Sequence, residues 1–213
     1  MTALGDPLVL LPLSSTDTPG FRVFKNTGAL YSVRLWGPLG PLWTGSFTMG
    51  LSRLGFDIRR GFARQDPSGP WVAEFLITPT ADAPEPSTID YLGLAADPHP
   101  LSGAEPDSHA SPVELNDYAL DGSPDQGSTL YLEVRGPDRV GFLGSLLRSL
   151  AQLSLLPKEM TIETHAGEVF DRFSLQSVGG RVPSDAARQA LARALDTLVR
   201  RRLTFPRVLP TEV

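Results

Sequence analysis

Apolar residues occupy every second position in two stretches of the chain that lie far apart. One stretch runs through Leu130, Leu132 and Val134, and the other through Tyr31, Val33 and Leu35. A period of two is typical of a strand with one buried face. After the later stretch, apolar residues recur at helical spacing, at Phe142, Leu143, Leu146, Leu147, Leu150 and Leu153. The pattern predicts a strand that turns abruptly into a helix packed on a sheet.

The two alternating stretches belong to a longer internal repeat. Gly37-Pro38 corresponds to Gly136-Pro137 at an offset of 99 residues. The same offset relates Gly45-Ser46 to Gly144-Ser145, Leu51 to Leu150 and Leu54 to Leu153. Phe75 corresponds to Phe173 at an offset of 98, as a loop longer by one residue at 66–69 would produce. Such self-similarity indicates a duplicated structural unit.

Each copy continues with two more strands. In the later copy, segment 157–177 has the pattern of two strands around a turn at Ala166 and Gly167. In the earlier copy, segment 56–78 corresponds to it, with its turn at 66–69. The sequence therefore predicts a β-hairpin after the first helix of each copy.

A second helix is predicted in each copy. In the later copy it covers 183–202, with Ser184 as its N-cap and arginines 200–202 at its negative end. Segment 204–210 would then return as a short closing strand. In the earlier copy, segment 87–95 fits a short helix, and the residues after it are rich in Pro, Ala, Asp and Gly, as in a linker.

The predicted order of strand, helix, strand, strand, helix and strand occurs twice. It is the βαββαβ order of ferredoxin-like folds, an α+β class with an antiparallel sheet and both helices on one face. We expect a tail over 1–19, a first and degenerate unit over 20–97, a linker over 98–111, and a second unit with a leading strand over 112–213. The uncovered sheet face and edges predict association, as in a homodimer.

One segment fits two places in this scheme. Residues 113–120 suit either the fourth strand of the first unit or a leading strand of the second. Residues 21–26 precede the first unit in a similar place.

Composition and charge exclude several classes of function. The formal net charge of −5 argues against a nucleic-acid partner, which would require a basic face. The chain has no cysteine, which excludes thiolate catalysis and thiolate metal sites. No apolar stretch approaches a membrane span, and none resembles a signal peptide. We expect a cytoplasmic protein without membrane partners. Arg59, Arg60 and Arg64 could line a neighbouring strand, but we expect them to be solvated.

No set of residues in the sequence points to catalysis or to a cofactor. His99, His109 and His165 lack the paired spacing of metal ligands. Ser46 and Ser145 lack the Gly-x-Ser-x-Gly context of an exposed nucleophile. We therefore predict that the protein is not an enzyme and uses neither a cofactor nor a metal ion.

The strand-to-helix turn of the later copy resembles the opening of an ACT domain. In that family a strand is followed by Asp-Arg-x-Gly-Leu-Leu and a helix. Here the corresponding residues are Asp138, Arg139, Val140, Gly141, Phe142 and Leu143. The next two strands are also similar, with Thr161, Thr164, Gly167, Asp171 and Phe173. The whole resembles tandem ACT proteins, such as the ACT pair ending the bacterial uridylyltransferase/uridylyl-removing nitrogen sensor and plant ACT-repeat proteins.

The resemblance implies an allosteric regulatory protein, with a role in nitrogen metabolism, that binds an amino acid and acts on its own assembly or on a protein partner. In the family the ligand lies between two units and touches this turn of one and the second strand of its neighbour. Carried over, the ligand-binding residues are Asp138, Arg139, Val140, Gly141, Phe142, Leu143, Met160, Thr161 and Ile162.

The physical chemistry of the turn is compatible with such a ligand. Gly141 permits a close approach of the backbone, and the N–H groups of the first helical turn attract a carboxylate. Asp138 is a candidate acceptor for the ammonium group of an amino acid. The competing structural interpretation is that Asp138 serves only as an N-cap.

The earlier copy departs from the ACT motif. Leu39 and Gly40 stand where Asp and Arg are expected, so an ammonium group would lose its acceptor there. Trp36 and Trp43 suit either a contact surface or the core. The alternative function is therefore a structural or protein-interaction module of paired ACT units that binds no ligand.

Overall fold

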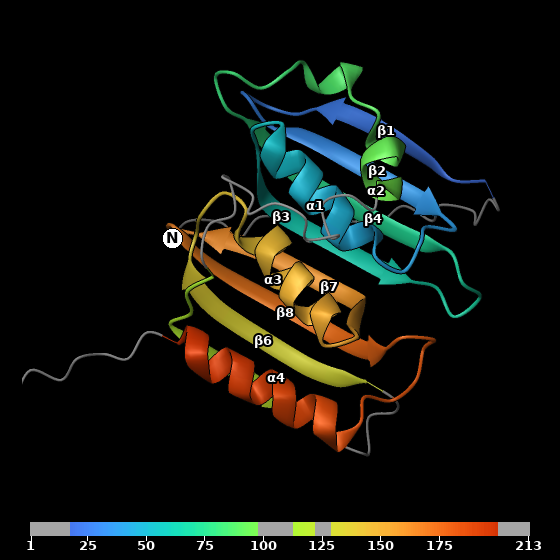
Figure 1. The fold of residues 1–213 in the computed structure, drawn as a ribbon. Helices are drawn as coiled ribbons and strands as arrows, with labels where there is room; N and C mark the ends of the chain where they lie inside the picture. The colour runs from blue at the N-terminus through green and yellow to red at the C-terminus, as the bar shows by residue number, and fades with distance from the viewer. Residues whose placement is uncertain (1–17, 98–112, 122–128, 200–213) are drawn as a thin grey trace, which may run out of the picture.

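The computed structural model describes residues 18–97, 113–121 and 129–199. The predicted tail, the linker, His99, His109, arginines 200–202 and the closing strand at 204–210 lie almost entirely outside these residues. Within the described part, the fold is α+β, with four α-helices and one eight-stranded antiparallel sheet (Figure 1). No helix of the described part is long and apolar enough to cross a membrane.

The first half of the chain forms four strands and two α-helices, and a short 3-10 helix lies between its last strand and its second α-helix. These are β1 (Gly20–Lys25), β2 (Tyr31–Gly37), α1 (Trp43–Arg53), β3 (Phe56–Gln65), β4 (Trp71–Pro79), η1 (Pro86–Thr88) and α2 (Tyr91–Ala96). The helix expected at 87–95 is thus divided between η1 and α2. Its division follows from Asp90, whose side chain accepts from the Gly93 N–H and begins α2 as an N-cap.

The second half repeats the same order. Its elements are β5 (Asp117–Asp121), β6 (Leu130–Pro137), α3 (Phe142–Gln152), β7 (Leu155–His165), β8 (Glu168–Ser177) and α4 (Asp185–Leu198). Ala166 and Gly167 form the predicted turn, both with positive φ. Ser184 is the predicted N-cap of α4, and its hydroxyl accepts from the Ala187 N–H at 3.2 Å.

The repeat extends to irregular details of the backbone. α1 and α3 begin 99 residues apart, as do β2 and β6, and β3 and β7. A β-bulge falls at Arg59 in β3 and at the corresponding Lys158 in β7. Gly55 and Ser154, also 99 residues apart, both have positive φ. Bulges re-aim neighbouring side chains, so both halves turn their side chains alike where they meet.

The outer strand of each half precedes its unit in the chain, which is one of the two placements that the sequence allowed for 113–120. The closing strand predicted at 204–210 lies outside the described residues. β1 pairs with β2 in a hairpin, and β5 pairs with β6. Residues 117–121 therefore belong to the second half. The physical reason is that β2 and β6 each need one more antiparallel neighbour, which a preceding strand supplies through a short local connection.

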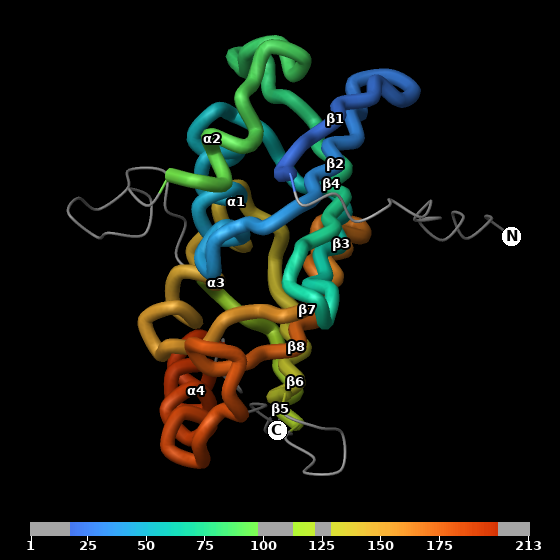
Figure 2. The backbone as a smooth tube through the Cα atoms, turned by 90° about the vertical axis from the view of Figure 1, so that its right-hand side faces the viewer, coloured from blue at the N-terminus to red at the C-terminus, as the bar shows by residue number. Residues whose placement is uncertain are grey.

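The two halves share one sheet and one core. β3 and β7 pair antiparallel, with Gly61 opposite Ile162, and we call this pairing the seam between the two halves. The strand order of the sheet is β1-β2-β4-β3-β7-β8-β6-β5. All helices lie on one face of this sheet (Figure 2). A single cluster of buried apolar side chains includes residues of both halves. Trp43 is in this core at 1% exposure, whereas Trp36 is half-buried, with the Arg22 guanidinium over its ring.

Helices α1 and α3 pack closely at Gly144. A Cβ atom there would lie 2.6 Å from Met49 Cγ and 3.3 Å from the Met49 backbone. We expect Gly144→Leu to lower the free energy of unfolding by about 1–3 kcal/mol through overpacking, measured by urea denaturation. Gly40→Leu is the control, since a Cβ at Gly40 meets nothing within 4 Å. Equal effects of the two substitutions would contradict this account of the contact.

Candidate functional site

The turn between β6 and α3 leaves the start of the helix without a side-chain cap. Gly141 is the N-cap, with φ 84°, and no side chain bonds to the first turn of α3. The Asp138 N–H donates to the Gly167 carbonyl, and the Phe142 N–H donates to the Arg139 carbonyl. Asp138 is therefore not the N-cap. The N–H groups of Leu143 and Gly144 have no carbonyl one turn earlier in the helix, so they face this turn as donors.

A small cavity lies between this turn and the first half of the chain. Its interior measures about 30 Å³, room for about one water molecule. The residues lining it are Thr48, Ser52, Phe56, Asp57, Ile58, Asp138, Arg139, Gly141, Phe142, Leu143, Gly144, Ile162, Thr164, Val169 and Asp171. They come from α1 and β3 of one half and from the turn, α3, β7 and β8 of the other. The cavity is thus built by both halves.

Most of the residues predicted for the ligand site line this cavity. They are Asp138, Arg139, Gly141, Phe142, Leu143 and Ile162. Val140 is 44% exposed and does not line it. Met160 is buried in the core and faces Ala63 across the seam, and Thr161 faces Phe62. The strand of the neighbouring half that lines the cavity is the start of β3.

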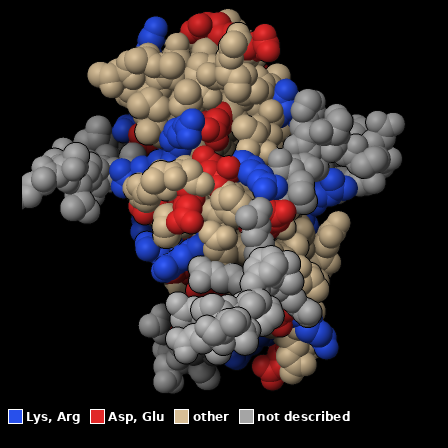
Figure 3. Space-filling model, turned by 90° about the vertical axis from the view of Figure 1, so that its left-hand side faces the viewer, with Lys and Arg blue, Asp and Glu red and all other residues tan. Residues whose placement is uncertain are grey.

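Asp138 has a cation partner from the first half. Its carboxyl lies 3.5 Å from a guanidinium nitrogen of Arg59, which also contacts Asp57 at 2.9 Å. Burial raises the pKa of Asp138, the Asp57 charge adds to this, and Arg59 opposes it. The Arg59 side chain is 44% exposed, as expected for a solvated arginine, and it also reaches the second half through its contact with Asp138. Acidic and basic side chains are interspersed on this side of the molecule (Figure 3).

Arg139 is also engaged within the protein. Its guanidinium lies 2.9 Å from the Glu114 carboxylate, in the segment leading to β5. Its charge is therefore largely offset within the second half.

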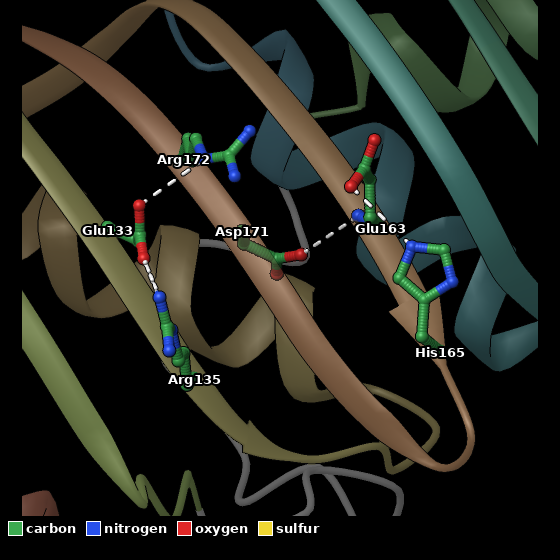
Figure 4. Close-up of polar contacts among 6 residues, drawn as sticks. All are labelled: Glu133, Arg135, Glu163, His165, Asp171 and Arg172. Carbon is green, nitrogen blue, oxygen red and sulfur yellow. Dashed lines mark hydrogen bonds and ion pairs between the residues drawn. The ribbon is translucent and has the colours of Figure 1, made fainter. Parts of the chain in front are cut away.

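Asp171 is a site residue that the sequence prediction missed. Its carboxyl group is fully buried on β8. One oxygen accepts from the Glu163 N–H at 3.4 Å (Figure 4), and the other has no hydrogen-bond partner in the protein. Burial raises the pKa of Asp171 to about 8, against the opposing Glu163 backbone hydrogen bond and with added repulsion from Asp138. The signal was in the strand pattern, since Asp171 falls in the buried phase of Val169 and Phe173.

A second buried polar atom without a partner lines the same cavity. The Ser52 hydroxyl, in the last turn of α1, forms no hydrogen bond. Buried polar groups are nearly always bonded, so two such atoms in one cavity, one from each half, can accept hydrogen bonds from a polar group there, either a water molecule or part of a ligand. Nothing in the sequence around Ser52 distinguished it from other helix-surface serines.

The opposite end of the seam carries a different cavity at corresponding positions. It measures about 370 Å³ and is lined by Leu39, Pro41, Gln65, Trp71, Leu156, Pro157, Gln176, Gly179 and Gly180. At the offset of the repeat, Leu39 takes the place of Asp138, and Leu156 takes that of Asp57. Ala151 and Ala73 stand where Ser52 and Asp171 stand in the first cavity. Of these two cavities, the one at the 138–141 turn is lined by Asp57, Asp138 and Asp171, and the other has no acidic residue in its lining. We call the first one the acidic cavity.

The donor set of the acidic cavity does not form a metal site. Among the described residues, no group of three His, Asp or Glu side chains is placed to hold a metal ion.

Comparison of the chain with protein-family models finds no match, and neither does comparison with curated proteins.

Proposed function

We propose that this protein is a non-catalytic regulatory protein of the tandem ACT type, which binds an amino acid at the 138–141 turn and passes the signal to its assembly or to a partner. Each half is then one ferredoxin-like unit whose outer strand precedes it. The observation that carries the proposal is the cavity between the turn of one half and the β3 strand of the other. This is the position that the resemblance to ACT pairs implies for a ligand.

The chemistry of the turn supports the carboxylate end of such a ligand. α3 starts at a left-handed glycine without a side-chain cap, so its first N–H groups and the positive end of the helix dipole are available to an anion. The acidic groups behind them suit a positively charged group on the same ligand. A zwitterion meets both requirements.

The second candidate is a structural module of paired units that binds no ligand. It is favoured by the seam itself, because a shared sheet and core hold the halves together without any ligand. The lost Asp-Arg pair at Leu39 and Gly40 also fits this function.

A thermal-unfolding screen against the twenty amino acids, each at millimolar concentration, tests the proposal. A ligand at about 100 times its Kd adds about 2.7 kcal/mol, and for about 200 residues each kcal/mol raises the midpoint by roughly 2–4 °C. We expect a rise for one or a few amino acids. A flat panel would contradict the proposal and favour the structural module.

Gly141→Val should abolish this rise, because valine is strained at φ 84° and would move the first turn of α3. Gly28→Val is the matched control. Gly28 has φ +68° with nothing within 4 Å of an added Cβ, so it carries similar strain far from the cavity. Loss of the ligand response in both variants would show that strain alone, and not the turn, is responsible.

A further inference from the structure

Two buried polar atoms without hydrogen-bond partners belong to residues that line the acidic cavity, one from each half of the chain, and the proposed function does not yet use them. Asp171 contributes a carboxylate oxygen from β8, and Ser52 contributes its hydroxyl from the end of α1. Asp171 shares the phase of Val169 and Phe173, whose side chains lie between the sheet and the helices. Its carboxyl is therefore on the cavity side of the sheet.

The size of the cavity restricts what can enter. The room for a water-sized group is about 30 Å³, and an ammonium group is about that size. An ammonium group has only donors to offer, and an unpartnered carboxylate oxygen and a hydroxyl oxygen can both accept them. Asp138, the acceptor expected from the sequence, already has Arg59 as its partner.

We infer that the primary ammonium group of the ligand enters this cavity and donates hydrogen bonds to Asp171 and Ser52, while its carboxylate stays at the start of α3. This inference rests on the proposed function and narrows it to ligands with an ammonium group beside a carboxylate, that is, to free amino acids. Deaminated analogues of the same amino acids lack the donors for these two oxygens, so they lose the hydrogen bonds that the ammonium group gains on binding.

Binding is coupled to the release of a proton. In the free protein, burial holds the pKa of Asp171 at about 8, so its carboxyl is mostly protonated at neutral pH. An ammonium group beside it favours the carboxylate, and the carboxyl proton then leaves to solvent. The charged groups that act on Asp171 are Asp138 at the turn and Glu163 on β7. Asp57 and Arg139 also line the cavity, Arg59 contacts Asp138, Glu114 contacts Arg139, and His165 contacts Glu163 at 3.6 Å.

The opposite end of the seam provides the matched comparison. Ala151 and Ala73 correspond to Ser52 and Asp171 at the offset of the repeat, and the cavity at that end is lined by apolar, amide and glycine residues. We therefore expect one ammonium site in each chain.

Titration calorimetry tests the inference with the amino acids that raise the midpoint in the thermal screen. Measured at pH 7 in two buffers of different ionisation enthalpy, binding should release up to one proton, and the deaminated acid of the same side chain should not bind. Asp171→Asn should abolish proton release and weaken binding about ten- to a hundredfold. Ser52→Ala should weaken binding less and retain proton release.

The outcomes separate this inference from the proposed function. An amino acid that binds without proton release, and equally well to Asp171→Asn, overturns the inference and leaves the amino-acid function standing. A panel without any binding overturns both. If Asp171→Asn does not fold, two other measurements test the inference. The inference is wrong if the deaminated acid binds the wild-type protein as tightly as the amino acid does and if Ser52→Ala binds the amino acid as tightly as wild type.

Discussion

Asp171→Asn should make the protein more stable relative to wild type as the pH rises from about 4 to 8. The pKa of Asp171 is raised by burial from its ordinary value of 3.8 to about 8. Between these values the unfolded chain loses the proton and the folded chain keeps it, so wild-type stability falls as pH rises. The loss is up to about 1.4 kcal/mol for each pH unit. Asparagine has the same shape and does not ionise, so this loss disappears.

The measurement is urea denaturation of both proteins at pH 5, 6, 7 and 8. Asp66→Asn is the control, because hydrogen bonds from Ser68 lower the pKa of the exposed Asp66. The stability that this lowered pKa contributes is constant between pH 5 and 8 and is lost only at acid pH, as Asp66 becomes protonated. The Asp66→Asn control should therefore not alter the slope between pH 5 and 8. Parallel curves for wild type and Asp171→Asn would show that Asp171 ionises as readily in the folded protein as in the unfolded chain.

Trp43→Ala should lower the free energy of unfolding by about 3–5 kcal/mol, the range for large aromatic truncations in a core. Trp43 is 1% exposed and contacts the rings of Phe47, Trp71 and Phe75 at centroid distances of 5.4–6.3 Å. Because the core cluster includes both halves, the variant should still unfold in a single transition at a lower temperature. Differential scanning calorimetry measures both quantities.

Trp43→Phe is the matched control, since Phe142 occupies the corresponding position of the second half. It keeps an aromatic ring in the core and removes the Trp43 indole N–H, which is buried without a partner. It should therefore cost much less than alanine. Two separate transitions in Trp43→Ala would contradict a core shared between the halves.

Local patterns in the sequence were sufficient for β6, α3, the hairpin of β7 and β8, and α4 of the second half. The alternation at Leu130–Pro137 and the apolar stripe of α3 each correspond to one face buried against one layer. The pattern is weaker in α1, which buries Thr44, Ser46 and Thr48 beside its apolar residues. α1 packs against α2, α3 and the sheet, so polar residues on several faces are buried and the helical period is blurred.

The seam and the partners of the site could not be read from local patterns. Pairing of β3 with β7 joins segments about a hundred residues apart, and no turn chemistry specifies it. The contact of Arg59 with Asp138 depends on the pairing of β3 with β7 and on the β-bulge at Arg59, so the sequence did not predict this contact. Asp171 is different, because its charge in an apolar strand phase was visible, and only its lack of a partner required the three-dimensional structure.

The seam between β3 and β7 joins parts of a single covalent chain, and this has a consequence for how the protein behaves on dilution. Separate units come apart as their concentration falls, whereas tethered halves keep a high effective concentration of each other. A symmetric dimer also repeats every substitution at both ends of its interface, and a tandem chain does not. Each molecule therefore carries one acidic cavity and one cavity without acidic residues, in a fixed ratio at any protein concentration.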